Sequence, residues 1–140
     1  MHYLDTSVLT ACFYPEARSA AVQHLLSRLE GQTISPLVEV ELYCTVARKV
    51  RAGQIEVSAA LRIFSEYQMH LVEHRFGIVP VGAAEYTLAR EWLAQLTTSL
   101  RVLDALHLAA AFANGLTLVT ADKDLAKAAG HFGVKHKLVS

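Results

Sequence analysis

The chain has 140 residues, of which 13 are basic and 13 acidic, so its formal net charge is zero. This length suits one domain with its own core, and a hydrophobic content of 53% excludes a disordered chain. The balanced charge excludes a protein that binds nucleic acid through a broad basic surface, so any such contact would need a local basic patch or bridging metal ions.

Short apolar runs alternate with helical patterns along the chain. In order, the expected elements are a strand at 3–4, helices at 7–14 and 16–30, a strand at 33–34, helices at 36–52 and 56–73, a strand at 78–81, helices at 83–96 and 104–113, a strand at 116–119, a helix at 124–129, and an edge strand near 134 and 138–139. Ser7 and Ser35 are the expected N-caps of their helices. This alternation predicts an α/β fold with a short central parallel sheet and helices on both faces.

Cys12 and Cys44 both lie among apolar neighbours, and we expect two small buried thiols in a reducing compartment. The first residues lack the organisation of a signal peptide, and the apolar stretch 103–119 is interrupted by polar side chains. No repeat or linker divides the chain. We therefore expect one soluble, cytoplasmic domain over residues 1–140.

Acidic residues stand where the strands of such a sheet end. Asp5 directly follows the first strand, Asp122 follows the fourth, and Asp104 begins a helix whose N-terminus can approach the same edge. Ligands of open parallel sheets bind beyond the carboxyl ends of the strands, so these acids are expected to converge there.

Glu41 lies within a helix, and its neighbours one turn away are mainly apolar. An ionised glutamate facing an apolar surface costs several kcal/mol, roughly, unless it is paired or binds a metal. Since no lysine or arginine lies one turn from Glu41, and Arg48 is two turns away, a cation from solvent is the simplest partner.

Carboxylate oxygens are hard ligands that suit Mg²⁺ or Mn²⁺ better than zinc. Ions bound by several acids can activate water and stabilise the leaving oxygen of a phosphodiester. Each acid also has a structural alternative: Asp104 and Asp122 as helix N-caps, Asp5 as a surface residue at a strand end, and Glu41 as a flank residue that reaches solvent. Spacing alone leaves both interpretations open.

Other polar residues have two interpretations as well. His70 and His74 are four residues apart on a helix and could share a metal, but no third ligand is evident. His107, one turn after Asp104, either orients that acid or packs in the core. The basic residues near the acids either hold nucleic-acid phosphates or are solvated helix ends; they are Arg48, Lys49, Arg51, Lys123 and Lys127.

Four segments, in order, resemble the acidic motifs of PIN-domain proteins. They are Tyr3–Leu9, Ser35–Arg48, Leu103–Ala111 and Leu118–Leu125, so the resemblance spans nearly the whole chain. The length and the absence of further domains resemble the VapC toxins of toxin–antitoxin pairs.

The resemblance implies a three-layer α/β/α fold and metal-dependent hydrolysis of RNA, which leaves a 5′-phosphate and a 3′-hydroxyl. By motif, Asp5, Glu41, Asp104 and Asp122 would be the catalytic acids that bind Mg²⁺ or Mn²⁺. The residues that would support these ligands are Thr6, Ser7 and Thr120, with Asp124 at a position that is acidic only in some members. A homodimer and a VapB-like antitoxin, whose C-terminal segment blocks the active-site groove, are implied as well.

Two other functions compete with this hypothesis. An aspartate-dependent phosphatase needs a second carboxylate two residues after the first, and Ser7 stands at that position. A receiver-like binding module needs an acidic pair at the first strand end, where Asp5 stands alone, and a degenerate PIN-domain RNA-binding module would have lost acids that this chain keeps. The RNA target, the identity of the antitoxin and the number of metal ions stay open.

Overall fold

The computed structural model describes residues 1–140 as one parallel sheet and seven helices. In chain order the elements are β1 (His2–Leu4), α1 (Thr6–Phe13), α2 (Ser19–Leu26), β2 (Gln32–Ile34), α3 (Pro36–Arg51), α4 (Val57–Val72), β3 (Gly77–Ile78), α5 (Ala83–Ala94), α6 (Val102–Ala113), β4 (Thr117–Thr120), α7 (Lys123–His131) and β5 (His136–Leu138). Every predicted strand and helix is present, with shifted ends.

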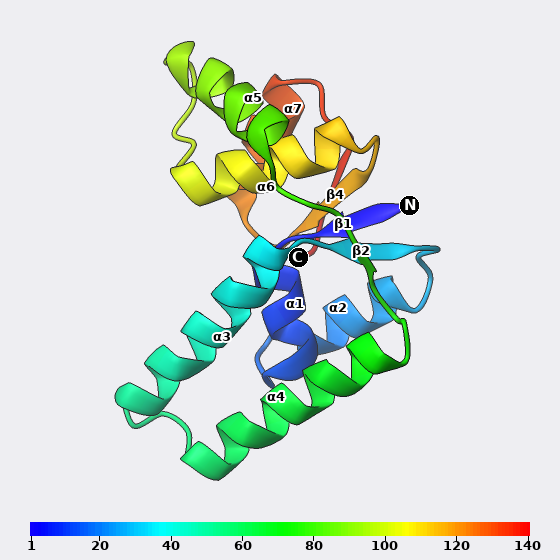
Figure 1. Ribbon diagram of the computed structural model, residues 1–140, viewed down its shortest axis with the longest axis vertical. Helices are drawn as coiled ribbons and strands as arrows, with labels where there is room; N and C mark the ends of the chain where they lie inside the picture. The colour runs from blue at the N-terminus through cyan, green and yellow to red at the C-terminus, as the bar shows by residue number, and fades with distance from the viewer.

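The sheet has the strand order β3-β2-β1-β4-β5, and all of its pairs are parallel. Figure 1 shows α5, α6 and α7 on one side of the sheet and α1 and α2 on the other, with α3 and α4 packed against α1 farther out. This is the α/β/α arrangement predicted from the alternation of strands and helices.

The core lies around the central strand and the alanine-rich helix. Tyr3 and Leu4 of β1 are fully buried, and α6 is buried along most of its length. Alanines at 105 and 109–111 let α6 approach β1 and β4 closely, because a small side chain leaves little between two backbones. The start of α6 is thereby held near the end of β1.

The first helix begins one residue earlier than predicted, and its cap is a different residue. The Asp5 carboxylate accepts a hydrogen bond from the backbone N–H of Val8 and is the N-cap of α1. The Ser7 hydroxyl does not cap this helix; it donates to Asp5 and accepts from the N–H of Ala121. The prediction for α3 was correct, since Ser35 caps it and Pro36 occupies its first turn.

Two segments are much shorter than predicted, and the last strand is shifted. Helix α2 covers Ser19–Leu26 rather than 16–30, because the Ser19 hydroxyl accepts from the N–H of Glu16 and fixes a turn before the helix. Strand β3 covers Gly77–Ile78 rather than 78–81, because Pro80 has no N–H and β2 already turns into α3. At the far edge only His136–Leu138 pairs with β4.

The two cysteines differ from the expectation and from each other. Cys12 is partly buried, and burial raises the pKa of its thiol to about 12. Cys44 is exposed on α3, so the prediction of burial was wrong for it, because the core-facing stripe of that helix runs through Val38, Leu42 and Val46.

None of the helices combines the length and apolar character that a membrane span requires.

Candidate active site

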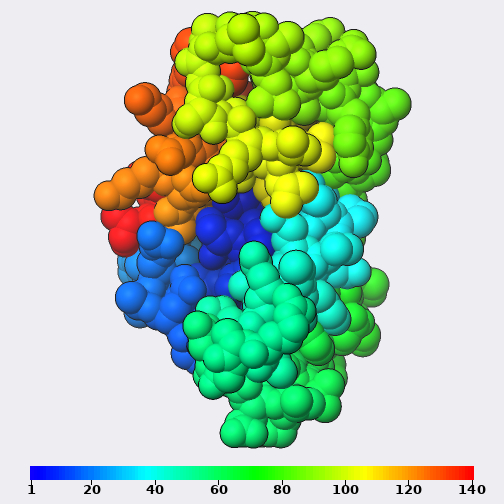
Figure 2. All heavy atoms as spheres, turned by 90° about the vertical axis from the view of Figure 1, so that its left-hand side faces the viewer, coloured from blue at the N-terminus to red at the C-terminus, as the bar shows by residue number.

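Asp5 and Asp122 lie at the edge of the sheet where two neighbouring strands end. Strand β1 pairs with β4, but along the chain it leads to β2 on its other side, which makes the gap between β1 and β4 a topological switch point. In Figure 2 the N-terminal segment forms the floor of a depression bordered by the start of α6, by α3 and by the chain after β4.

Asp5 is almost completely buried, and hydrogen bonds hold both of its carboxylate oxygens. Oδ1 accepts from the Ser7 hydroxyl at 2.6 Å and from the Val8 N–H at 3.1 Å, and Oδ2 accepts from the Thr120 hydroxyl. Burial raises the pKa of Asp5, although the hydroxyl and backbone donors and the nearby His107 oppose that rise. The carboxylate is thus fixed in position, in a setting that disfavours its charge.

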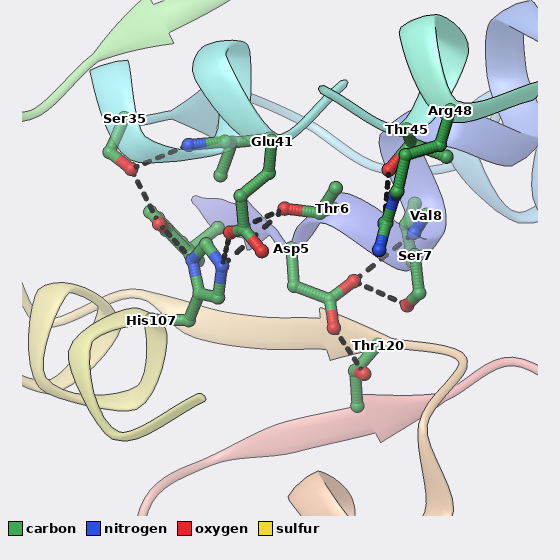
Figure 3. Close-up of polar contacts among 12 residues, drawn as sticks. Asp5, Thr6, Ser7, Val8, Ser35, Glu41, Thr45, Arg48, His107 and Thr120 are labelled. Carbon is green, nitrogen blue, oxygen red and sulfur yellow. Dashed lines mark hydrogen bonds and ion pairs between the residues drawn. The ribbon is translucent and has the colours of Figure 1, made fainter. Parts of the chain in front are cut away.

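Glu41 reaches from α3 to the same edge, as Figure 3 shows. Its Oε1 accepts a hydrogen bond from the Thr6 hydroxyl at 2.9 Å and forms an ion-pair contact with Nε2 of His107. Burial opposes its ionisation, but His107, the Thr6 hydrogen bond and the charge of Arg48 together hold the pKa of Glu41 below its usual range. Glu41 is partly buried, as its apolar neighbours predicted. Its partner in the structure is the imidazole of His107, whereas the sequence suggested a cation from solvent.

His107 is held in turn by a buried hydroxyl chain that sequence reasoning missed. The Tyr3 hydroxyl lies 2.8 Å from Nδ1 of His107 and 2.7 Å from the Ser35 hydroxyl, which accepts from Val38 N–H. When His107 is neutral and donates from Nε2 to Glu41, its Nδ1 accepts from Tyr3, and Ser35 donates to Tyr3; when His107 is protonated, both ring nitrogens donate. The available signal was a tyrosine in a central strand, since a buried hydroxyl needs a partner.

Asp104 lies in the first turn of α6, and it forms neither of the two ion pairs in the structure, Arg75–Glu73 and His107–Glu41. Burial raises the pKa of Asp104, and so do the charges of Asp122, Asp5 and Glu41, against an opposing effect of His107. The fold therefore brings the four predicted acids near enough for their charges to interact. The helix begins at Val102, so Asp104 is not its N-cap.

Asp122 has the structural role that the sequence left open for it. Its Oδ1 accepts from the N–H groups of Asp124 and Leu125, which makes it the N-cap of α7. Its own N–H donates to the Thr120 hydroxyl, which also contacts Asp5. A cap uses one carboxylate oxygen here, so the second oxygen is still available to a ligand. The Asp124 side chain is exposed.

The basic residues singled out in the sequence have separate surroundings. Arg48 is exposed, lies 3.5 Å from the Thr45 hydroxyl and is close enough to lower the pKa of Glu41. Lys49 instead sits over the Tyr14 ring, with its Nζ 4.2 Å from the ring centroid. Lys123 is exposed at the first position of α7, next to Asp122. Arg48 and Lys123 thus flank the acids from two sides, and Lys49 does not.

The donor set at this edge fits a hard divalent cation. It consists of carboxylate and hydroxyl oxygens, without thiolate ligands, and the repulsion that raises the pKa of Asp104 is the kind that a bound cation relieves. No three His, Cys, Asp or Glu side chains lie close enough together to form a closed ligand cluster. The pair His70 and His74 does not form one either; His70 stacks on Phe76.

The chain matches a family model described as the PIN domain over residues 2–131. A search of curated protein sequences found no match.

Several solved structures share this fold. FitAcB of Neisseria gonorrhoeae is 22% identical, with a TM-score of 0.73 and coverage of 97% of this chain and 96% of that one. VapC20 of Mycobacterium tuberculosis, described as a toxin that cleaves the sarcin–ricin loop, is 20% identical, with a TM-score of 0.72 and coverage of 91% and 95%. VapBC2 of Rickettsia felis, bound to a promoter DNA fragment, is 20% identical, with a TM-score of 0.71 and full coverage of both chains.

Proposed function

This chain belongs to the PIN-domain family, and we propose on that basis that it is a Mg²⁺- or Mn²⁺-dependent endoribonuclease, the VapC-type toxin of a toxin–antitoxin pair. The observation that carries the proposal is the meeting of four carboxylates at one sheet edge: burial raises the pKa of Asp104, and the charges of Asp122, Asp5 and Glu41 add to that rise. A purely structural group of acids would be expected to form ion pairs, and Asp104 forms none.

In this proposal Asp5, Glu41, Asp104 and Asp122 would hold the ion, which would supply an activated water and neutralise charge on the phosphodiester. Ser7 and Thr120 keep both oxygens of Asp5 in place, and Thr6 keeps Glu41 in place. His107 orients Glu41 and is itself fixed by Tyr3. Lys123, exposed at the first position of α7, would face the incoming nucleic acid.

The RNA substrate, the antitoxin and a homodimer are parts of the same proposal. The FitAcB, VapC and VapBC structures support an antitoxin partner, because they come from such pairs. The toxin described as cleaving the sarcin–ricin loop supports RNA rather than another phosphodiester as the substrate class. We include in this proposal that residues 1–140 form a single domain and that the protein acts in the cytoplasm.

The test is cleavage of RNA by the purified full chain with and without metal. Chelation with EDTA should abolish cleavage, and Mg²⁺ or Mn²⁺ should restore it. Full activity in a thoroughly chelated sample would reject the carboxylate mechanism. Mapping the RNA ends should reveal 5′-phosphates and 3′-hydroxyls.

Two alternatives predict different results in the same assay. A degenerate PIN module would bind RNA without cutting it at any metal concentration. An aspartate-dependent phosphatase would release phosphate from a small phosphomonoester and leave internal RNA bonds intact. Ser7 stands where the phosphatase would need its second carboxylate. Its hydroxyl instead donates to Asp5 and accepts from the N–H of Ala121.

A further inference from the structure

A small polar pocket lies beside the carboxylates, between α1, α3 and the segment before α2. It has a volume of about 210 Å³, and its lining contains no apolar residue. It is formed by the residues Thr6, Ser7, Thr10, Glu16, Arg18 and Thr45. Two of these, Thr6 and Ser7, also donate hydrogen bonds to Glu41 and Asp5, so the pocket and the acids share a wall.

One hydroxyl of this pocket has no partner. Thr10 is 7% exposed, and its Oγ1 is the one buried side-chain polar atom in the structure without a hydrogen bond. An unsatisfied buried hydroxyl costs about 1–3 kcal/mol, so its presence calls for a ligand or another compensation. In the same pocket the Thr45 hydroxyl accepts a long contact from Arg48, and its own O–H remains free to donate.

The charges around the pocket favour an anion. Arg18 lines it and forms no ion pair, and Arg48 of α3 contacts the Thr45 hydroxyl, which also lines the pocket. Glu16 is the one acid of the lining and opposes this preference. The Thr10 and Thr45 hydroxyls and the Arg18 guanidinium, with that of Arg48 next to Thr45, are donors that suit a phosphate, which accepts several hydrogen bonds at once.

We infer that this pocket is a subsite for one backbone phosphate of the RNA, adjacent to the carboxylates, in which Thr10 donates a hydrogen bond and Arg18 supplies charge. The inference rests on the proposed ribonuclease function and deepens it. A phosphate held there would place the neighbouring phosphodiester over the acids, because Thr6 and Ser7 border both places.

Binding is measured with the full chain carrying Asp5→Asn, so that RNA is not cut, and a labelled random-sequence single-stranded RNA as the probe. Fluorescence anisotropy over a series of salt concentrations gives the affinity and its salt dependence. Arg18→Ala should weaken binding and lower the slope of log affinity against log salt by about one. Arg62→Ala, at an exposed position on α4, is the matched control and should change neither as much.

Glu16→Gln distinguishes an anion from a cation in the pocket. Removal of its charge should strengthen RNA binding if a phosphate occupies the site. Weaker binding by Glu16→Gln would mean that the pocket receives a cationic group, and would overturn the inference. Arg18→Ala and Arg62→Ala with the same affinity and slope would overturn it as well.

Thr10 is tested with two variants of nearly the same size. Thr10→Val should weaken binding about 3- to 10-fold without changing the salt slope, and Thr10→Ser should keep parental binding. Without RNA, Thr10→Val should raise the thermal midpoint by about 2–5 °C, because it removes a buried hydroxyl without a partner. A lower midpoint would show that the hydroxyl serves the fold and would overturn its role as a ligand.

Cleavage assays keep this inference separate from the proposed function. Metal-dependent RNA cleavage by the parent, together with unchanged binding in the pocket variants, rejects the subsite alone. Absence of cleavage by the parent under any metal condition rejects the proposed function, whatever the anisotropy gives.

Discussion

The two halves of the carboxylate group differ in how firmly the protein holds them. Asp5 and Glu41 receive hydroxyl and imidazole hydrogen bonds from residues far away in sequence, such as Thr120 and His107. Asp122 is held only by backbone N–H groups at the start of α7, and Asp104 is a half-buried acid without an ion-pair partner. Asp5 and Glu41 therefore form a preformed half of the site. Asp104 and Asp122 form a free half, which a ligand would complete.

This difference indicates where a cation would contribute most. Hydrogen bonds already compensate part of the burial of Asp5, and His107 does the same for Glu41. The charge of Asp104 meets three other carboxylates, so a cation is the partner that it lacks. Substitutions in the preformed half should mainly reduce catalysis, and substitutions in the free half should also change the stability of the metal-free protein.

The largest effect is expected from Asp5→Asn. The amide keeps the size of the side chain, and Thr120 can accept a hydrogen bond instead of donating one, so the fold should be retained. RNA cleavage should fall by roughly 100- to 10,000-fold. Thermal unfolding without metal should be unchanged or shifted upward, and metal should stabilise the variant less than the parent. A large loss of stability without metal would assign Asp5 a structural role instead.

The next effect separates two acids on α3. Glu41→Gln should lower turnover by about 100-fold or more, because it removes the acid that His107 orients. Glu39→Gln should leave turnover nearly unchanged, since Glu39 accepts a hydrogen bond from the Tyr67 hydroxyl at 2.7 Å, toward α4. Cleavage assays on both purified variants at matched metal decide the point. Parental activity of Glu41→Gln would remove it from the site.

A smaller effect is expected from the hydroxyl behind His107. Tyr3→Phe leaves Nδ1 of His107 without its partner, so activity should fall about 10-fold and stability by about 1–2 kcal/mol. Tyr67→Phe is the control, because it removes the hydroxyl of another buried tyrosine, which donates to Glu39 away from the acids. Its denaturant midpoint should fall similarly while turnover stays parental. An equal loss of turnover in both variants would mean that Tyr3 acts only through stability.

The smallest effect concerns the free half and depends on pH. The pKa of Asp104 is raised, so the stability that it contributes without metal is present below the usual aspartate pKa of about 3.9 and is lost as pH rises through the raised value. Asp104→Asn carries no charge at any pH. Its thermal midpoint at neutral pH should therefore exceed that of the metal-free parent, by on the order of 2 °C after solvent screening.

The gap should close as pH falls below the usual pKa, and Mg²⁺ should remove it at neutral pH by stabilising the parent. Glu91→Gln, on the exposed part of α5, controls for the loss of one negative charge. A gap of the same size at every pH would show that the charge of Asp104 does not cause it.

Much of the fold could be predicted because it depends on local patterns. Apolar runs predicted each strand, and Ser35 followed by Pro36 marked the start of α3 correctly. Ends that depend on a partner were less accurate. The third strand stops at Ile78 because its neighbour turns away, and α1 is capped by Asp5 because Ser7 is engaged by the end of β4.

The sequence by itself determined the strand–helix alternation and the positions of the four acids within it, because periodicity and strand ends are local properties of the chain. Only the tertiary structure decided which partners those acids have. Tyr3 reaches His107 across 104 positions of sequence, and Thr120 reaches Asp5 across 115. Hydrogen bonds of this kind require the packing of α6 and β4 against β1, and no local pattern encodes the distance between two side chains that meet only after the chain has folded.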